Sequence, residues 1–230
     1  MLASVTGILE SSKSDGGYGF VTRGIVTALD SRQTDSYSGS GTTWSDLSGN
    51  GNDAVLSGGI VQDVDNSFIF DGVNDVSTTS ILTSVFSSGN ASLCIYLKNF
   101  SASSNTQNNV LAYGDGVDAF LYAYGNGLGY IGTFRSARVD SIALSGSVTR
   151  TNFHQLTFTT ANGGNWNMYQ NNILVKTVSA EATVKFLDQY IGRDPVNVNK
   201  YKGNVSSLLI YNVELTTAEI ASNLTYNQSL

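Results

Sequence analysis

Short apolar segments separated by turn-forming clusters are the feature that most limits what this chain can fold into. From Gly24 onward such segments recur at intervals of about 8 to 12 residues, with Gly, Ser, Thr and Asn between them. Several alternate with a period of two, so that Phe68 and Phe70 share one face of their segment. Long surface helices would need far more charge than the 13% present. The sequence therefore predicts an all-β, antiparallel β-sandwich.

The turns place the predicted strands along the whole chain after Gly24. Asn171-Asn172 is a predicted hairpin turn, because Asn tolerates the positive φ of a type I′ turn. The segment 92–100 is apolar on both faces, which predicts a central strand. The predicted strands are residues 24–30, 53–61, 67–72, 92–100, 109–115, 119–126, 128–134, 141–146, 154–162, 165–172, 173–178, 189–194 and 204–212.

The two ends of the chain differ from its middle. Near the C-terminus, Thr216 and Glu219 form a capping box, and Leu215 and Ile220 have the spacing of a hydrophobic staple. We expect one short helix there, laid against the sandwich by Ile220 and Leu224. Residues 1–23 lack a clear amphipathic repeat and are predicted to form an extended arm that becomes ordered by packing, for example on a neighbouring subunit. Residues 24–230 form the predicted domain.

Charge and hydropathy narrow the classes of partner. The formal net charge is -6 and the isoelectric point about 4.6, so nucleic acid and anionic membranes are repelled by the average field. No apolar run approaches the ~20 residues that a transmembrane helix needs. Residues 1–20 contain Glu10, Lys13 and Asp15 without a continuous apolar stretch, which predicts no signal peptide.

Three blocks, in the order expected of one family, carry a resemblance. The first is TTWSDLSGNGNDAVL (42–56), which contains Trp44. The second is FIFDGVNDV (68–76), which has Asn74 and Val76 where the family's motif has an acid and an aromatic residue. The third covers 153–160, 166–175, 189–194 and 201–227. Together they resemble laminin G-like jelly-roll domains of the concanavalin A-like lectin and glucanase superfamily, over roughly residues 24–227. The resemblance implies a concanavalin A-like jelly roll, in which Trp44 packs inward.

Catalytic chemistry finds little support. Glycanases similar to this family use a Glu-x-Asp-x-x-Glu strand, with two carboxyl groups about 5 Å apart for a retaining mechanism, and the sequence has no such segment. Cys94 and His154 are the single cysteine and histidine, so zinc lacks ligands. We read Cys94 as a small buried apolar residue and His154 as structural. Paired aspartates such as Asp63 and Asp65 are explained by loop solvation. The sequence predicts that the chain is not an enzyme.

Calcium is the one cofactor that the sequence keeps open. Oxygen-rich loops of similar domains sometimes hold calcium. In and next to the loop SGNGND (48–53), the candidate oxygen ligands are Asp46, Asn50, Asn52 and Asp53. The alternative is that these side chains only cap turns.

A sugar would need an aromatic platform beside polar groups. Tyr113, Tyr122, Tyr124 and Tyr130 could supply one from neighbouring strands, or they could be core or subunit interface. These four tyrosines are the candidate glycan-binding residues.

Two functional hypotheses follow from the resemblance. The segment 28–53 most resembles structural proteins of tailed bacteriophages. This implies a virion structural protein at the capsid surface, a decoration or cement protein that binds the major capsid protein or other virion proteins and forms a homo-oligomer, for instance a trimer. The alternative is a carbohydrate-binding, lectin-like module of a fibre or adhesin. An inactive relative of a glycanase is a third reading.

Overall fold

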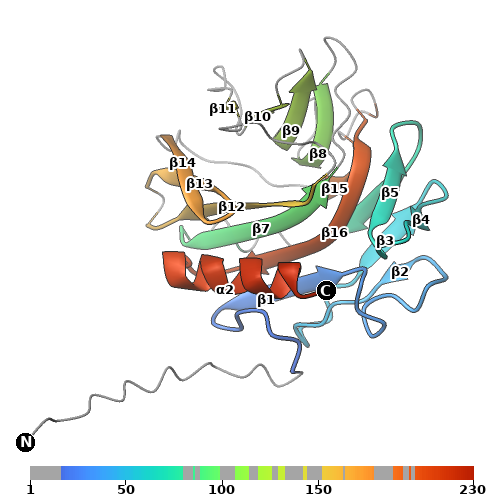
Figure 1. Cartoon of the computed structure of the whole chain (residues 1–230), viewed down its shortest axis with the longest axis horizontal. Coiled ribbons are helices and arrows are strands. Elements are labelled where there is room, and N and C mark those ends of the chain that lie inside the picture. The colour runs from blue at the N-terminus through green and yellow to red at the C-terminus, as the bar shows by residue number, and fades with distance from the viewer. Residues whose placement is uncertain are drawn as a thin grey trace, which may run out of the picture.

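Two antiparallel sheets packed face to face, with one helix, form the fold in the computed structural model (Figure 1). The structure describes residues 17–79, 85, 89–98, 107–113, 119–125, 129–132, 142–143, 152–162, 164–178, 189–193, 197 and 200–230. Between 107 and 143, and at 178 and 189, it describes the backbone alone. The predicted all-β sandwich with a C-terminal helix is confirmed.

Sheet A is centred on β7 (Ala91–Lys98) and β16 (Lys202–Tyr211), which pair with each other. β7 is buried along nearly its whole length, which confirms the predicted central strand. One half of β16 pairs with β1 and the other with β5. The remaining strands of sheet A are β1 (Ile25–Asp30), β4 (Val61–Gln62), β5 (Phe68–Asp71), β12 (His154–Thr160), β13 (Trp166–Gln170) and β14 (Ile173–Val178).

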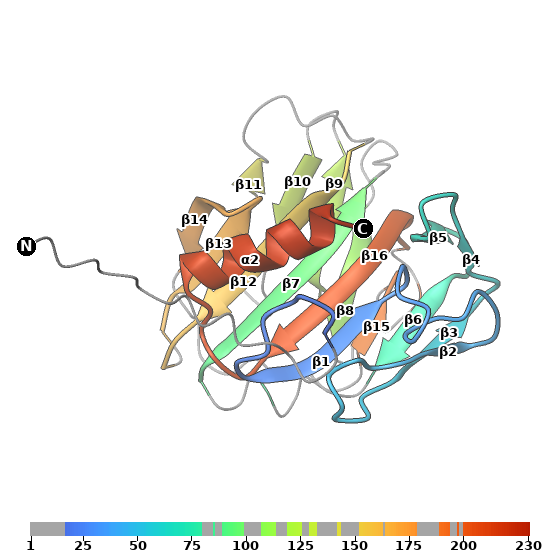
Figure 2. The same cartoon turned by 60° about the horizontal axis from the view of Figure 1, so that its bottom comes forward.

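Sheet B covers the other side of the core. Its strands lie in the order β11-β10-β9-β8-β15-β6-β3-β2, so that β15 joins the sequence-distant halves of the sheet (Figure 2). The strands are β2 (Thr43–Trp44), β3 (Ala54–Ser57), β6 (Val76–Thr79), β8 (Gln107–Tyr113), β9 (Ala119–Gly125), β10 (Gly129–Gly132), β11 (Ile142–Ala143) and β15 (Gln189–Ile191).

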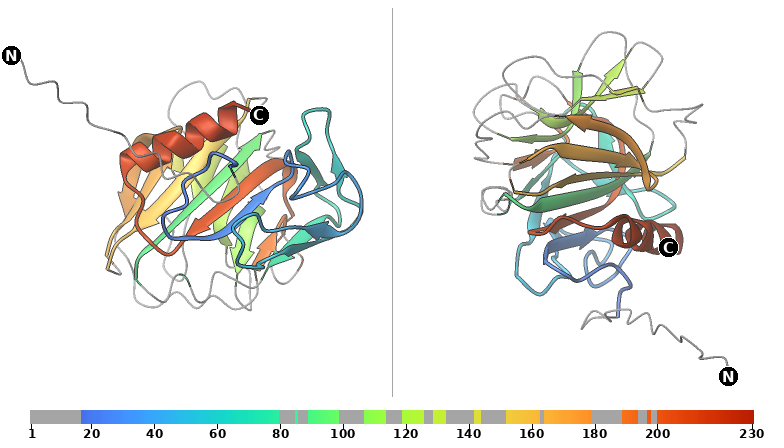
Figure 3. Two further views of the ribbon diagram at one scale, coloured as in Figure 1. Left: turned by 90° about the horizontal axis from the view of Figure 1, so that it is seen from below. Right: turned by 90° about the vertical axis from the view of Figure 1, so that its left-hand side faces the viewer.

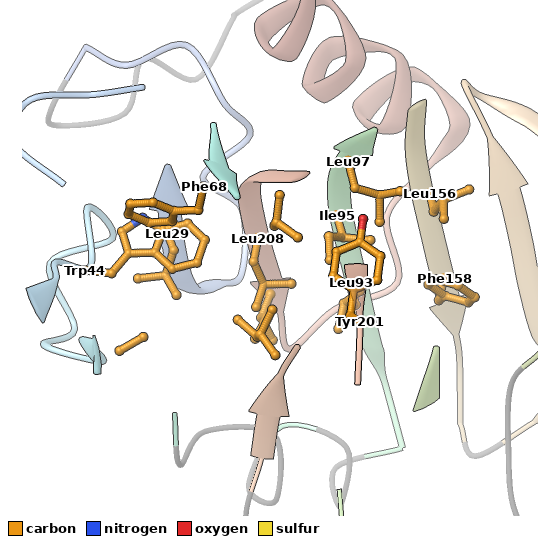
Figure 4. Packing of buried hydrophobic residues seen from close by; sticks show 14 of the residues in the cluster. Leu29, Trp44, Phe68, Leu93, Ile95, Leu97, Leu156, Phe158, Tyr201 and Leu208 are labelled. Atoms are coloured by element: carbon orange, nitrogen blue, oxygen red, sulfur yellow. The ribbon is translucent and has the colours of Figure 1, made fainter. Parts of the chain in front are cut away.

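The core lies between the two sheets and is rich in aromatic rings (Figure 4). Trp44 is fully buried, as predicted, and meets the Phe68 ring edge-on, with the ring centroids 4.9 Å apart. Tyr37 packs against the same ring. Each such edge-to-face pair contributes roughly 0.5–1.5 kcal/mol beyond the burial of its two rings. The first sequence block therefore fastens β2 to sheet A through its aromatic residue.

The helix α2 (Thr217–Gln228) lies across the outer face of sheet A (Figure 3). The predicted capping box of Thr216 and Glu219 is present. A second apolar cluster beneath the helix includes Ile220, Leu215 and Tyr226. No helix in the part of the chain that the structure describes is long and apolar enough to cross a membrane.

The described end of the predicted arm packs on the domain's own helix. Phe20 is buried against Tyr226, with centroids 5.6 Å apart, and Tyr18 stacks on Phe20. Residues 1–16 of the predicted arm lie outside the described residues.

Two local predictions are wrong. The predicted strand 53–61 is two strands, β3 and β4, because Gly58 has a φ of +91° and approaches the chain at Asn74 so closely that a Cβ would lie 2.2 Å from the Asn74 oxygen. The predicted helix stripe of Ile220 and Leu224 is only half right. Leu224 is partly exposed, and Asn223, fully buried, occupies the contact with the sheet.

Candidate functional site

The carboxylate of Asp46 organises the SGNGND loop. Its Oδ1 accepts the backbone N–H of Ala28 at 2.8 Å and of Ser48 at 2.9 Å. Its Oδ2 accepts the hydroxyl of Ser48 at 2.7 Å and the N–H of Asn52 at 3.0 Å. Asp53 accepts the N–H of Asp46 at 2.8 Å. Both oxygens of Asp46 are thus used to shape the loop and to hold it on β1.

The two asparagines of the loop strengthen the same attachment. Asn50 and Asn52 each donate an amide N–H to the Val26 carbonyl, at 3.0 and 2.7 Å. Calcium takes about six to eight oxygen ligands, whereas these side chains direct nitrogen at β1 and the Asp46 oxygens already accept protein donors. Across the described residues, no group of three or more His, Cys, Asp or Glu side chains could hold a metal. The geometry agrees with turn capping, and calcium binding here stays a prediction.

Asp63 and Asp65, a candidate carboxylate pair, are both bound to one cation. Lys98 forms an ion pair with each, at 3.3 Å between Nζ and the Asp63 Oδ2. A hydrogen bond from the Val64 N–H, with Lys98 beside it, lowers the pKa of Asp63. Burial raises the pKa of Asp65, but hydrogen bonds from Lys98 and Ser67 outweigh it, so this pKa is also lowered. Both groups favour the ionised form, unlike a general acid.

Cys94 and His154 lie on opposite faces of sheet A. His154 is opposite Leu97 in the β7–β12 ladder and Cys94 is opposite Thr157. Since side chains alternate along a strand, the histidine faces the core between the sheets and the thiol faces α2. Burial raises the pKa of Cys94 to about 11. The two side chains do not form a nucleophile and base pair.

Three of the four candidate tyrosines occupy one face of sheet B. Tyr124 on β9 lies opposite Tyr130 on β10, and Tyr122 lies opposite Gly132. Residues opposite each other in an antiparallel pair share a face, as do residues two apart on one strand. Positions 122, 124 and 130 are therefore neighbours on one face of two adjacent strands.

The strand pairs that lead from the core residue Ile191 identify this face as the outer face of sheet B. Ile191 is fully buried between the sheets and lies opposite Leu111 of β8. Leu111 in turn lies opposite Leu121 of β9, so Leu121 continues the core side. Residues 121 to 124 of β9 are all paired, one after another, so their faces alternate without interruption. The tyrosine at 122, one residue further on, is consequently placed on the outer face.

Tyr113 is placed apart from the other three. It lies opposite Gln189 of β15, two residues from Ile191 on the same strand. The register therefore assigns position 113 to the core side of sheet B.

Two amide residues share the outer face with the tyrosines. Gln107 lies opposite Tyr124, and Asn109 lies opposite Tyr122, in the β8–β9 ladder. Sequence reasoning missed them because β8 begins two residues earlier than predicted and its polar start, Gln-Asn-Asn, looks like a loop. We call Gln107, Asn109, Tyr122, Tyr124 and Tyr130 the tyrosine face.

This set of residues has the composition of a recognition surface. Aromatic rings offer flat apolar area with a polar hydroxyl, and each amide offers both donors and an acceptor. Such a surface binds and orients a ligand; its groups are poor general acids and bases near neutral pH.

The fold and the sequence blocks define a lectin-like β-sandwich. Residues 70–221 match the family model of the concanavalin A-like lectin/glucanases superfamily. This is more than half of the chain, and the chain belongs to that family. A search of the curated proteins found no match.

Solved structures share the fold at low sequence identity. Trypanosoma rangeli sialidase in complex with sialic acid is 18% identical, with a TM-score of 0.68, over 90% of this chain and 33% of the sialidase. A second sialidase structure, in complex with 2,3-difluorosialic acid, gives the same values. The receptor binding domain of botulinum neurotoxin C/D mosaic serotype is 16% identical, with a TM-score of 0.68, over 90% of this chain and 52% of the other. The chain thus spans about a third of the sialidase and about half of the toxin domain.

Proposed function

We propose that this domain binds glycans through the tyrosine face and does so without catalysing a reaction. The observation that carries the proposal is the strand register, which brings Tyr122, Tyr124 and Tyr130 together on the outer face with Gln107 and Asn109 beside them. Sugar rings stack their apolar faces on aromatic side chains while amides bind their hydroxyl groups.

The similar structures support recognition of this kind. One is a sialidase bound to sialic acid, and another is named a receptor binding domain. By analogy, we propose that this sandwich serves as a recognition scaffold. The analogy rests on fold alone, and for this reason the ligand must be argued from the residues of this chain.

The ionisable groups support a role without catalysis. Asp63 and Asp65 are held by Lys98, and Cys94 is separated from His154 by the thickness of sheet A. These described groups are arranged to hold the fold.

A glycan array with matched tyrosine variants tests the proposal. We expect the wild-type domain to bind a set of glycans, and Tyr124→Ala to weaken that binding by about fivefold or more, since a lost stacking contact costs roughly 1 kcal/mol or more. Tyr169→Ala, on β13 of sheet A, is the control and should bind as the wild type does. Absence of binding to any glycan, or full binding by a folded Tyr124→Ala variant, would overturn the proposal.

A second candidate is a structural role in a virion. It is supported by the resemblance of residues 28–53 to structural proteins of tailed bacteriophages. In this proposal the domain decorates the capsid, and residues 1–16 reach a neighbouring subunit or the major capsid protein.

The packing of Phe20 decides how this second candidate should be tested. Because Phe20 and Tyr18 pack on the domain itself, a deletion must stop before them. Removal of residues 1–16 should leave the melting temperature unchanged and lower the occupancy of the protein on particles. Unchanged occupancy would exclude this role for the arm.

A further inference from the structure

The strands that carry the tyrosine face are without charge. Within the described strands β8, β9, β10 and β11, no position is Asp, Glu, Lys or Arg. The tyrosine face therefore offers hydroxyls, amides and aromatic rings, but no fixed cation. From this pattern, and resting on the proposed function, we infer that the ligand is an uncharged glycan and not a sialylated, sulfated or uronic acid-bearing one.

Recognition of an anionic sugar needs a cation at the site. Carboxylates and sulfates are bound strongest by Arg, which gives two parallel charge-assisted hydrogen bonds. Removing an anion from water without such a partner is costly. Amides such as those of Gln107 and Asn109 both donate and accept, which matches a sugar hydroxyl, itself a donor and an acceptor.

The charge of the rest of the chain works in the same direction. The formal net charge is -6. In the sequence, the connections between these strands carry the acids Asp115, Asp118 and Asp140 and the arginines Arg135 and Arg138, so their formal charge does not favour an anion. A negative field lowers the local concentration of an anionic ligand and its rate of association.

Several basic residues that the structure describes are engaged elsewhere. Arg23 pairs with Glu219, Arg32 with Asp30, and Lys98 with two aspartates, and in each pair one member belongs to a strand of sheet A or to α2. Just after β15 of sheet B, the guanidinium of Arg193 lies 4.9 Å from the ring centre of Tyr190.

Arg193 is the described cation to test against the inference. Tyr190 lies opposite Ala112, near the end of β8 remote from Gln107. The guanidinium of Arg193 is held over Tyr190, which pairs with Ala112 and not with a residue of the tyrosine face. We expect an uncharged ligand to need no contribution from Arg193.

Matched pairs of neutral and acidic glycans test the inference. The probes are N-acetyllactosamine and other neutral glycans that the array identifies, each compared with its sialylated and sulfated derivative. At about 20 mM salt we expect the neutral member to bind at least about threefold tighter, and the gap to narrow at about 300 mM, because salt screens the repulsion. Arg193→Gln should leave the binding of neutral glycans unchanged.

The outcomes separate the two proposals. Tighter binding of the acidic members overturns the inference and leaves glycan binding itself intact, and a loss of that preference in Arg193→Gln would assign it to the arginine. Binding of neither class contradicts the proposed function. Equal binding at both salt concentrations also overturns the inference, since it shows that the face does not discriminate by charge.

Discussion

Two adjacent asparagines at the tip of the β13–β14 hairpin affect the stability of the fold in opposite directions. Asn171 and Asn172 both have positive φ, 46° and 65°, as a type I′ turn requires. The Asn171 Oδ1 accepts the N–H of Gln155 at 2.9 Å, which ties the turn to β12. The Asn172 Oδ1 is buried and accepts no hydrogen bond within the described part of the chain.

Glycine at these two positions should therefore change stability in opposite directions. Asn172→Gly removes a buried carbonyl without a donor and suits the positive φ, so it should raise the free energy of unfolding by roughly 0.5–1 kcal/mol. Asn171→Gly suits its φ equally well but loses the bond to Gln155, and should lower the free energy of unfolding by about 1 kcal/mol. Urea denaturation of the two variants measures both. Equal effects of the same sign would show that φ alone governs the turn.

At the scale of residues, apolar positions could be predicted and buried polar positions could not. Trp44 is buried as the family resemblance implies, and Phe68 and Phe70 share the core-facing side of β5 as their alternation predicts. Asn223 gives no such signal. It is buried because it accepts the N–H of Val21 and donates to the Tyr211 hydroxyl, both at 2.9 Å. The burial of Asn223 thus depends on partners that are distant in sequence.

The helix α2 is held from outside by the described end of the N-terminal segment. Arg23 donates two hydrogen bonds to the Glu219 carboxylate and one to the Glu214 carbonyl. Glu219 also accepts the N–H of Thr216 in the capping box. The hydrogen bond from Arg23, helped by those from Thr216, lowers the pKa of Glu219 to about 2.

Stability should therefore depend on pH through this carboxylate. The folded pKa lies below the unfolded value of about 4.3, so the contribution is complete above that value and is lost as the pH falls toward 2. Because Arg23 is about half exposed, we expect Glu219→Gln to cost only about 1 kcal/mol at neutral pH. The difference from the wild type, measured by urea denaturation, should shrink as the pH falls from about 4 to about 2 and vanish below the folded pKa.

The neighbouring glutamate provides the control. The backbone carbonyl of Glu214 accepts a hydrogen bond from Arg23. Glu214→Gln keeps this hydrogen bond and should therefore show the wild-type pH profile. A constant deficit of Glu219→Gln across the whole pH range would contradict a role for the charge.

At the scale of elements, strands and helix could be predicted from periodicity and turn signals, with ends shifted by a few residues. The division of 53–61 into β3 and β4 could not, because it depends on the approach of Gly58 to Asn74 in another loop. The pairing of β15 with β6 and β8 could not be predicted either, since strand partners that are distant in sequence leave no local pattern.

For the molecule as a whole, we expect the fold to be independent of metal. Asp46 shapes its loop with backbone donors and one hydroxyl. Treatment with a chelator should leave the melting temperature unchanged by calorimetry. A metal worth 1 kcal/mol would shift it by roughly 2–4 °C, and a drop of that size, restored by calcium, would place calcium in the loop.

The candidate site shows what the whole molecule adds to its sequence. The sequence indicates that the four tyrosines lie on neighbouring strands, but it does not show which face of the sheet each of them occupies. Sorting them needs the chain of pairs from Ile191 through Leu111 to Leu121, and the β8–β9 ladder contains register shifts that local alternation cannot reveal. These pairs separate Tyr113 from the other three.

Tyrosine-specific NMR during a glycan titration tests this sorting most directly. With ring-labelled tyrosine, resonances assigned by single Tyr→Phe variants should shift for Tyr122, Tyr124 and Tyr130 as the glycan binds. Tyr113, assigned to the core side, should not respond. Shifts at Tyr113 with none at the other three, or binding that moves no resonance of the tyrosine face, would contradict the account.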